Sequence, residues 1–295
     1  MSATLKTKNS PPLLAVLLLL VAMISIHSGA ALAKSLFPVI GAEGLITLRQ
    51  AIGTMILLVV FRPWRLRLHR GTRLPLLVYG VALGAMNYLF YLSLRTLPLG
   101  IAVALEFTGP LTVSLLSSRR PVDFLWLAMA GSGLCILLLL GQNVGSIDPV
   151  GAACALGAGA SWAIYIIAGQ KAGRDHGPGT VAIGSLIAAL IFCPLGAWQS
   201  TGPLLSLAVL PAALGVAILS TALPYSLEII ALPQMPARTF GTLMSLEPAM
   251  AALSGMLFLH EQLSLIQWGA LAAIIAASTG AALSARPAAR RKKHP

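Results

Sequence analysis

Ten stretches of mostly apolar residues alternate with short polar or turn-forming segments along the chain. They cover approximately residues 12–34, 44–61, 74–94, 98–117, 123–140, 149–170, 178–198, 205–230, 236–258 and 263–283. The segments between them contain charges and turn formers, as in Arg62-Pro63 and Gly141-Gln142-Asn143. Because a helix needs about 20 apolar residues to cross a bilayer, the pattern predicts an all-α polytopic membrane protein with ten transmembrane helices.

The composition supports this prediction and excludes a separate soluble domain. Hydrophobic residues make up 57% of the 295 residues and charged residues only 9%, whereas a soluble domain carries about a quarter charged residues. Cys135, Cys154 and Cys193 lie singly in apolar segments without a CxxC motif. We therefore expect neither a disulfide framework nor a metal or other cofactor.

The distribution of basic residues predicts the orientation. With the N-terminus placed inside, the inside segments hold 17 of the 20 Lys and Arg residues, and the outside segments hold only Lys34 and Arg95. This positive-inside pattern places both termini in the cytoplasm, including the basic tail at 286–295. A net charge of +12 would also suit nucleic acid. However, the basic clusters are not interleaved with aromatic residues, so we expect no nucleic-acid partner.

Three residues of the first half recur 138 residues later: Pro98, Pro110 and Asp123 are matched by Pro236, Pro248 and Glu261. A unit of five helices reverses its direction at the second copy, because five is odd. We therefore predict two inverted five-helix repeats, over 1–145 and 146–285, with a substrate site between them near the membrane midplane. The alternative is that a helix-rich chain yields a few matched prolines by chance.

The first apolar stretch has a second interpretation. Lys6 and Lys8 precede it, and Ala31-Leu32-Ala33 lies near its end, which imitates a cleavable signal peptide. However, the stretch is long enough to span a membrane, and the repeat needs it as its first helix. We therefore expect the chain to retain it.

Glu106 and Glu247 are the main candidates for a transport site. They lie eight residues after Pro98 and eleven after Pro236, which is about 12 and 16 Å along their helices at 1.5 Å per residue. Both are expected near the midplane, on equivalent helices of the two units. Ionisable groups are rare there and usually face a cavity, where a carboxylate can bind an ammonium group or exchange a proton. The alternative is a pair of protonated glutamates hydrogen-bonded across helices.

Three further ionisable residues have a functional and a structural interpretation. Arg49, some five residues inside the second stretch, would receive a substrate carboxylate or pair with a glutamate, or else extend to the outer membrane surface. Glu228 would act in the site, or reach water or pair with Arg238. His27 would relay protons, but a hydrogen bond to a neighbouring carbonyl is the simpler interpretation.

Neutral side chains complete the predicted cavity lining. Trp162 and Tyr165 are three residues apart and therefore share a helix face. For Ser and Thr, the alternative is a hydroxyl that bonds to a carbonyl within its own helix. The neutral candidates are Asn87, Tyr88, Tyr91, Thr108, Ser161, Trp162, Tyr165, Tyr225 and Ser245.

Five stretches of the sequence resemble a known family. They are NYLFY at 87–91, PLGIAVALEFTGP at 98–110, SSRRPVD at 117–123, TALPYSLE at 221–228 and RTFGTLMS at 238–245. They are similar to the drug/metabolite transporter superfamily, EamA type, and within it to enterobacterial threonine/homoserine exporters. The resemblance runs from about Leu18 to Leu283 and is lost in the first dozen residues and the basic tail. It implies efflux of threonine, homoserine and other small amino acids across a bacterial inner membrane.

The leading hypothesis is therefore a secondary exporter, an antiporter that exchanges small amino acids for protons. The alternative keeps the fold but widens the substrates to cationic or aromatic compounds, which intramembrane glutamates would also suit. An enzyme is not expected, because the sequence contains no Walker A, HExxH or GxSxG motif. Without an ATP site, an ion gradient or the gradient of the substrate itself must drive transport.

Overall fold

The computed structural model describes residues 13–65, 73–116, 121–136, 148–176, 179–200, 204, 206–231, 234 and 243–284. The regular elements in these ranges are all helices, as the apolar pattern predicts. They are α1 (Leu13–Ser35), α2 (Phe37–Phe61), η1 (Pro63–Arg65), α3 (Arg73–Ser93), α4 (Leu99–Glu106), α5 (Thr108–Leu116), α6 (Pro121–Cys135), α7 (Pro149–His176), α8 (Gly179–Gln199), α9 (Leu210–Ala217), the π-helix η5 (Ile218–Ala222), α10 (Leu223–Ala231), α12 (Glu247–Leu259) and α13 (Leu265–Ser284). The basic loop at 66–72, Ser146, Arg238 and the tail at 286–295 lie outside the described residues.

Six helices of the described ranges are long and apolar enough to cross a membrane. They cover Leu13–Ser35, Phe37–Phe61, Arg73–Ser93, Pro149–Ala172, Gly179–Gln199 and Leu210–Glu228. Four shorter apolar helices accompany them, over Leu99–Val113, Phe124–Cys135, Glu247–Leu259 and Leu265–Gly280. Large apolar side chains such as Trp198, Phe124 and Leu257 remain exposed. Lipid tails are as apolar as these side chains, so this exterior suits a bilayer.

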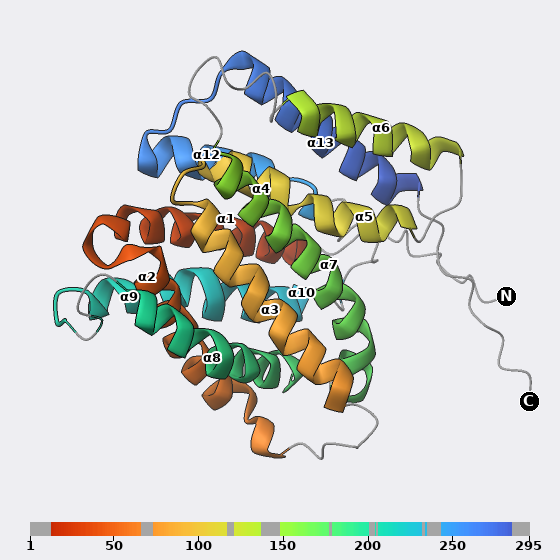
Figure 1. Cartoon of the computed structure of the whole chain (residues 1–295). Coiled ribbons are helices and arrows are strands. Elements are labelled where there is room, and N and C mark those ends of the chain that lie inside the picture. Colours follow the sequence, from red (N-terminus) through yellow and green to blue (C-terminus); the bar gives the residue numbers. More distant parts are fainter. Residues whose placement is uncertain are drawn as a thin grey trace, which may run out of the picture.

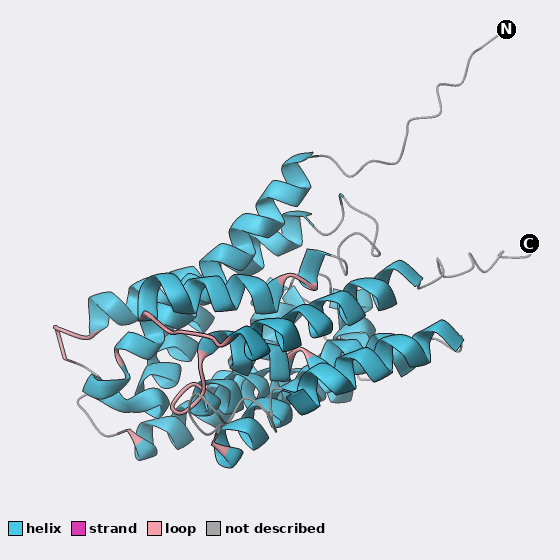
Figure 2. Cartoon of the chain, turned by 90° about the horizontal axis from the view of Figure 1, so that it is seen from above, coloured by secondary structure: helices cyan, strands magenta, loops and turns pink. Residues whose placement is uncertain are grey.

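Helices from the two halves of the chain pack against each other (Figure 1). Helix α3 lies against α7 and α8, α1 against α10 and α12, and α6 against α13. The connections α1–α2, α3–α4 and α12–α13 gather at one end of the bundle (Figure 1). Figure 2 shows the same bundle from above, built of helices joined by short loops. In the described ranges the two halves are therefore interleaved and do not form separate globular units.

The closest helix contact depends on two glycines. A Cβ atom added to Gly109 of α5 would lie 1.9 Å from the carbonyl oxygen of Gly159 in α7. A Cβ atom added to Gly159 would lie 2.6 Å from the carbonyl oxygen of Glu106. Small residues allow helix backbones to approach in membrane proteins. The position of α7 against the α4–α5 junction therefore requires glycine at both places.

Prolines alter the backbone hydrogen bonding within two of the predicted apolar stretches. The stretch 98–117 forms α4 and α5, with an interruption at Phe107. Proline has no N–H group, so Pro110 cannot donate to the carbonyl of Glu106 four residues earlier. The stretch 205–230 forms α9, η5 and α10, and Pro224 cannot donate to the carbonyl of Ser220 for the same reason. Both stretches therefore form the predicted apolar helices, with a local change of hydrogen bonding near each proline.

Two further boundaries differ from the prediction. Helix α2 begins at Phe37 and not near residue 44, and it bends at Gly41, whose φ of 74° suits glycine. Helix α12 begins at Glu247 with Pro248 in its first turn, whereas the prediction placed this glutamate inside a continuous helix over 236–258. Pro248 removes the hydrogen bond to the carbonyl four residues earlier, which favours a helix start at this point.

Candidate functional site

A cavity of about 440 Å³ lies inside the bundle, and both halves of the chain line it. Its walls come from α1, α2, α3, α4, α5 and α7, and from η5, α10, α12 and α13. Small-molecule sites in proteins usually measure about 300–1,000 Å³. The cavity can therefore hold a small amino acid.

Three carboxyl groups line the cavity: those of Glu106, Glu228 and Glu247. Glu106 is the last residue of α4, four residues before Pro110, and Glu247 is the first residue of α12, directly before Pro248. They are only 8% and 6% exposed. Within the described part of the chain, no hydrogen bond or ion pair engages any of the three carboxyl groups. The alternative of two glutamates hydrogen-bonded to each other therefore has no such bond to support it.

Arg49 supplies a positive charge in the same cavity. It is 3% exposed, so the interpretation that it extends to the membrane surface is wrong. Its Nη1 donates to Asn87 Oδ1 at 2.6 Å, its Nε to Ser220 Oγ at 2.8 Å and its Nη2 to Ser220 O at 2.9 Å. Its guanidinium carbon also lies 5.2 Å from the centre of the Tyr91 ring. Among the described residues, no carboxylate lies within 4.0 Å of this guanidinium.

The local sequence explains how Arg49 is held. Pro224 leaves the Ser220 carbonyl without its helical donor, and that carbonyl accepts the Arg49 Nη2 bond. Ser220 Oγ accepts from Arg49 and donates to the Val216 carbonyl at 2.6 Å. Asn87 Nδ2 donates to the carbonyl four residues before it at 2.8 Å, which aims its Oδ1 at the arginine. Neutral acceptors thus fix the guanidinium, and its charge has no direct ion pair with a described residue.

Aromatic rings form much of the remaining wall. Trp162 meets Phe107 edge to face, with ring centroids 5.8 Å apart. Tyr165 stacks on Tyr79 with centroids 4.6 Å apart, and the two hydroxyl oxygens lie 3.1 Å apart. Trp162 and Tyr165 both line the cavity, as their shared helix face predicts. Such rings present an apolar surface with a polar edge to a substrate.

Nine of the twelve predicted site residues line the cavity. They are Arg49, Asn87, Tyr91, Glu106, Trp162, Tyr165, Tyr225, Glu228 and Glu247.

The other three, Tyr88, Thr108 and Ser245, do not line it, and their hydroxyls bond elsewhere. Tyr88 hydrogen-bonds to a glutamine side chain of α8. Thr108 donates to the carbonyl three residues earlier at 2.6 Å, and the neutral candidate Ser161 donates to the carbonyl four residues earlier at 2.9 Å. Ser245 is fully buried, with its Oγ 3.1 Å from Ser278 Oγ.

Sequence reasoning undervalued His27. This residue lines the cavity and is 5% exposed, and its Nε2 has no hydrogen-bond partner among the described residues. The expected bond to a carbonyl is therefore absent at that nitrogen. Sequence reasoning also missed Ser220, although Pro224 four residues later signals its free carbonyl. The other missed polar or large lining residues are Met86, Phe90, Phe107, Met244 and Ser278.

In the described ranges, no group of three or more His, Cys, Asp or Glu side chains could hold a metal ion. The chemistry of the cavity is that of one guanidinium, several carboxyl groups and an imidazole between aromatic walls.

Comparison with known proteins identifies the family. Residues 149–283 match the EamA-like transporter family. The threonine/homoserine exporter RhtA of Escherichia coli (strain K12) is 63% identical over 286 residues, which cover 97% of each chain. The chain belongs to the EamA-like transporter family. This membership confirms the resemblance in the sequence, and it makes the protein a transporter and not an enzyme.

Two further comparisons agree with the family assignment. The threonine/homoserine exporter RhtA of Salmonella typhimurium (strain LT2) is 63% identical over 280 residues, or 95% of each chain. A crystal structure of a protein 20% identical covers 91% of this chain and 96% of its own, with a TM-score of 0.61. At that identity the match shows a shared fold.

Proposed function

We propose that this EamA-family transporter exports threonine, homoserine and related small amino acids in exchange for protons. One observation carries the proposal: a fixed guanidinium and several carboxyl groups line one cavity without pairing with each other in the described residues. A zwitterionic amino acid presents the two complementary charges. The choice of threonine and homoserine is supported by the 63% identical relatives, which are threonine/homoserine exporters.

In this proposal the substrate is bound between the two kinds of charge. Its carboxylate faces Arg49, which has N–H groups beyond the three that bond to Asn87 and Ser220. Its ammonium group faces Glu106 and Glu247. The aromatic wall excludes water, which strengthens both interactions.

Proton exchange follows from the balance of charge in the cavity. Three ionised carboxylates beside one guanidinium would leave excess negative charge in an apolar surrounding, which costs about 2.5–3.5 kcal/mol per ion at mid-membrane on insertion scales. Protons therefore occupy these carboxyl groups when the site is empty. The ammonium group of a substrate favours the ionised form, so amino-acid binding and proton release are linked.

We propose alternating access between two inverted five-helix units, over 1–145 and 146–285. The six long and four shorter apolar helices of the described residues correspond to the ten predicted segments, which supports a ten-helix arrangement. The interruption at Phe107 and the turn at Ser245 lie 138 residues apart, the offset of the matched prolines. The charge asymmetry of the loops supports a bacterial inner-membrane location with both termini in the cytoplasm.

A second candidate function is export of cationic or aromatic compounds. The rings of Phe107, Trp162 and Tyr165 around free carboxyl groups favour it, because aromatic faces attract cations. Arg49 argues against it, since a fixed guanidinium repels a simple cation but accepts a carboxylate.

Transport in proteoliposomes tests the proposal. With an imposed pH gradient, we expect labelled threonine to move against its own gradient, homoserine to compete with it, and a lipophilic cation to compete poorly. Empty liposomes provide the baseline. Movement of the lipophilic cation without movement of threonine would contradict the proposal and favour the second function.

A further inference from the structure

Four contacts hold the turn between α3 and α4. Arg95 Nη1 pairs with Glu43 Oε1 of α2 at 2.7 Å. Thr96 Oγ1 donates to Asp148 Oδ2, just before α7, at 2.9 Å, and the same oxygen accepts the N–H of Gly151 at 2.8 Å. The backbone on either side of Pro98 makes the other two contacts, with α1 and with the α12–α13 connection. Elements from both halves of the chain therefore meet on this one turn.

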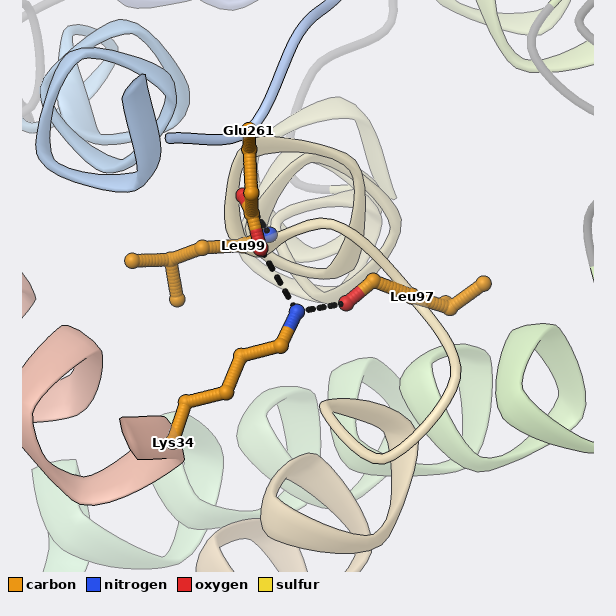
Figure 3. Close-up of polar contacts among 4 residues, drawn as sticks. All are labelled: Lys34, Leu97, Leu99 and Glu261. Atoms are coloured by element: carbon orange, nitrogen blue, oxygen red, sulfur yellow. Dashed lines mark hydrogen bonds and ion pairs between the residues drawn. The ribbon is translucent and has the colours of Figure 1, made fainter. Parts of the chain in front are cut away.

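The central contact joins Lys34 at the end of α1 to Glu261 after α12 (Figure 3). Lys34 Nζ lies 2.6 Å from Glu261 Oε1 and donates to the Leu97 carbonyl, also at 2.6 Å. The second carboxylate oxygen of Glu261 accepts the N–H of Leu99, the first residue of α4, at 2.8 Å. Glu261 thus caps α4, whose N-terminus otherwise lacks helical acceptors and attracts negative charge.

The backbone after α12 directs Glu261 onto α4. His260 adopts a left-handed conformation with φ 54° and ψ 29°, and its N–H bonds to the Gly255 carbonyl. This conformation, uncommon for a side chain other than glycine, turns the chain back over the helix end. A Cβ atom on Gly255 would lie 2.3 Å from Glu261 Oε2. Position 255 therefore leaves space for the carboxylate.

On both α1 and α4, the Lys34–Glu261 contact lies seven residues from a residue that lines the cavity. Lys34 follows the cavity residue His27 by seven residues on α1, and Leu99 precedes Glu106 by seven on α4. Seven residues correspond to about 10 Å along a helix and return to the same face. A cluster of buried hydrophobic residues, which includes Leu97 and residues of α4 and α12, lies next to this contact.

We propose that Lys34 and Glu261 form the outer gate of the transporter, joining α1 and α4 while the cavity is closed to the outside. The inference rests on the proposed function, in which the end of the bundle that holds the α1–α2 and α3–α4 connections faces outward. Both are positioning residues. They hold α4, and with it Glu106, in place and do not contact the substrate. Export requires the pair to separate, so that α1 and α4 part above the cavity.

Accessibility of the cavity to a membrane-impermeant maleimide tests the gate. The reporter is Ile166→Cys, which lines the cavity from α7, in a chain whose three native cysteines are replaced. We expect Lys34→Met and Glu261→Gln to increase the outside labelling rate of the cysteine at position 166 about fivefold. Loss of one partly exposed ion pair shifts the equilibrium from the closed toward the outward-open state. Labelling from the cytoplasmic side of inverted vesicles should fall in the same variants.

Lys34→Arg, which keeps the charge, should restore the slow outside labelling. Lys171→Met is the matched control, because Lys171 is exposed near the end of α7, 137 residues after Lys34, and makes no ion pair with a described residue. It should not accelerate outside labelling. Unchanged rates in Lys34→Met and Glu261→Gln, or rates that rise equally from both sides, would overturn the gate. Labelling requires no substrate, so failed threonine transport would count against the proposed function alone.

Discussion

Among single residues, Glu106 and Glu247 carry the carboxyl groups that we propose to bind the substrate. Each lies at a helix end, and neither has a hydrogen-bond partner among the described residues. Arg49, in contrast, is fixed by Asn87 and Ser220. The cation of the cavity is therefore held rigidly, whereas the carboxyl groups can respond to a substrate or a proton.

We expect Glu106→Gln and Glu247→Gln to reach the membrane in normal amounts but to lower threonine efflux about tenfold or more. Glutamine keeps the size of the side chain and removes the charge, and a hydrogen bond to a charged group contributes about 1.5–3 kcal/mol. The residual efflux should no longer depend on pH. Efflux at several pH values and equal expression, measured by immunoblot, checks this expectation, and we expect the larger loss for Glu106.

Thr108→Val is the matched control for these variants. It removes a hydroxyl two residues from Glu106 that bonds to the Leu105 carbonyl of α4 and does not line the cavity. Its efflux should equal that of the parent chain. Normal, pH-dependent efflux in both glutamine variants would contradict a role in transport, and loss of the folded protein would indicate a structural role.

Proline sets the shape of the cavity at the scale of helices. Pro110, Pro224 and Pro248 each remove a hydrogen bond to the carbonyl four residues earlier, and each break borders the cavity. At one break the freed carbonyl of Ser220 holds Arg49. At another, the carbonyl of Glu106 lies against α7. Discontinuous helices of this kind commonly bind substrates and ions in transporters.

Gly159→Ala tests the contact between α7 and the α4–α5 junction. The added methyl group would lie 2.6 Å from the backbone oxygen of Glu106, so one helix must shift. We expect a loss of about 1–3 kcal/mol of stability, as for overpacking in a core, and weaker threonine binding because Glu106 moves. Thermal unfolding in detergent and the KM for efflux measure the two effects.

Gly131→Ala in α6 provides the comparison, because a Cβ atom at that glycine meets no atom within 4 Å. Alanine is favoured over glycine in a helix by up to about 1 kcal/mol, so this variant should be as stable as the parent chain or more stable. Equal stability and KM for the two alanine variants would show that the contact does not position Glu106.

Packing between the two halves forms the site at the scale of the whole molecule. Helices α3 and α7 or α1 and α10 lie side by side although they are far apart in sequence (Figure 1). The cavity exists only where these pairs meet. An inverted repeat in such an arrangement requires an odd number of helices per unit and opposite orientations of the two units in the membrane.

We expect Ser146→Cys to react with an impermeant maleimide added outside intact cells, since the positive-inside pattern places its loop outside. Ser146 lies outside the described residues, and the expectation comes from the sequence. Arg62→Cys, at the end of α2, should react only after permeabilisation. Labelling of Ser146→Cys only in permeabilised cells would reverse the topology and with it the direction of the proposed gate.

The helical class, the family resemblance and the place of Glu106 and Glu247 in the cavity could be predicted from the sequence, because charges in long apolar stretches are rare and costly. The burial of Arg49, the position of His27 in the cavity wall and the set of hydroxyls that line the cavity are visible only in the tertiary structure. The physical reason is that lipid and the protein interior are both apolar, so a membrane helix shows little contrast between its buried and exposed faces. Only packing against helices from the other half selects the side chains that meet.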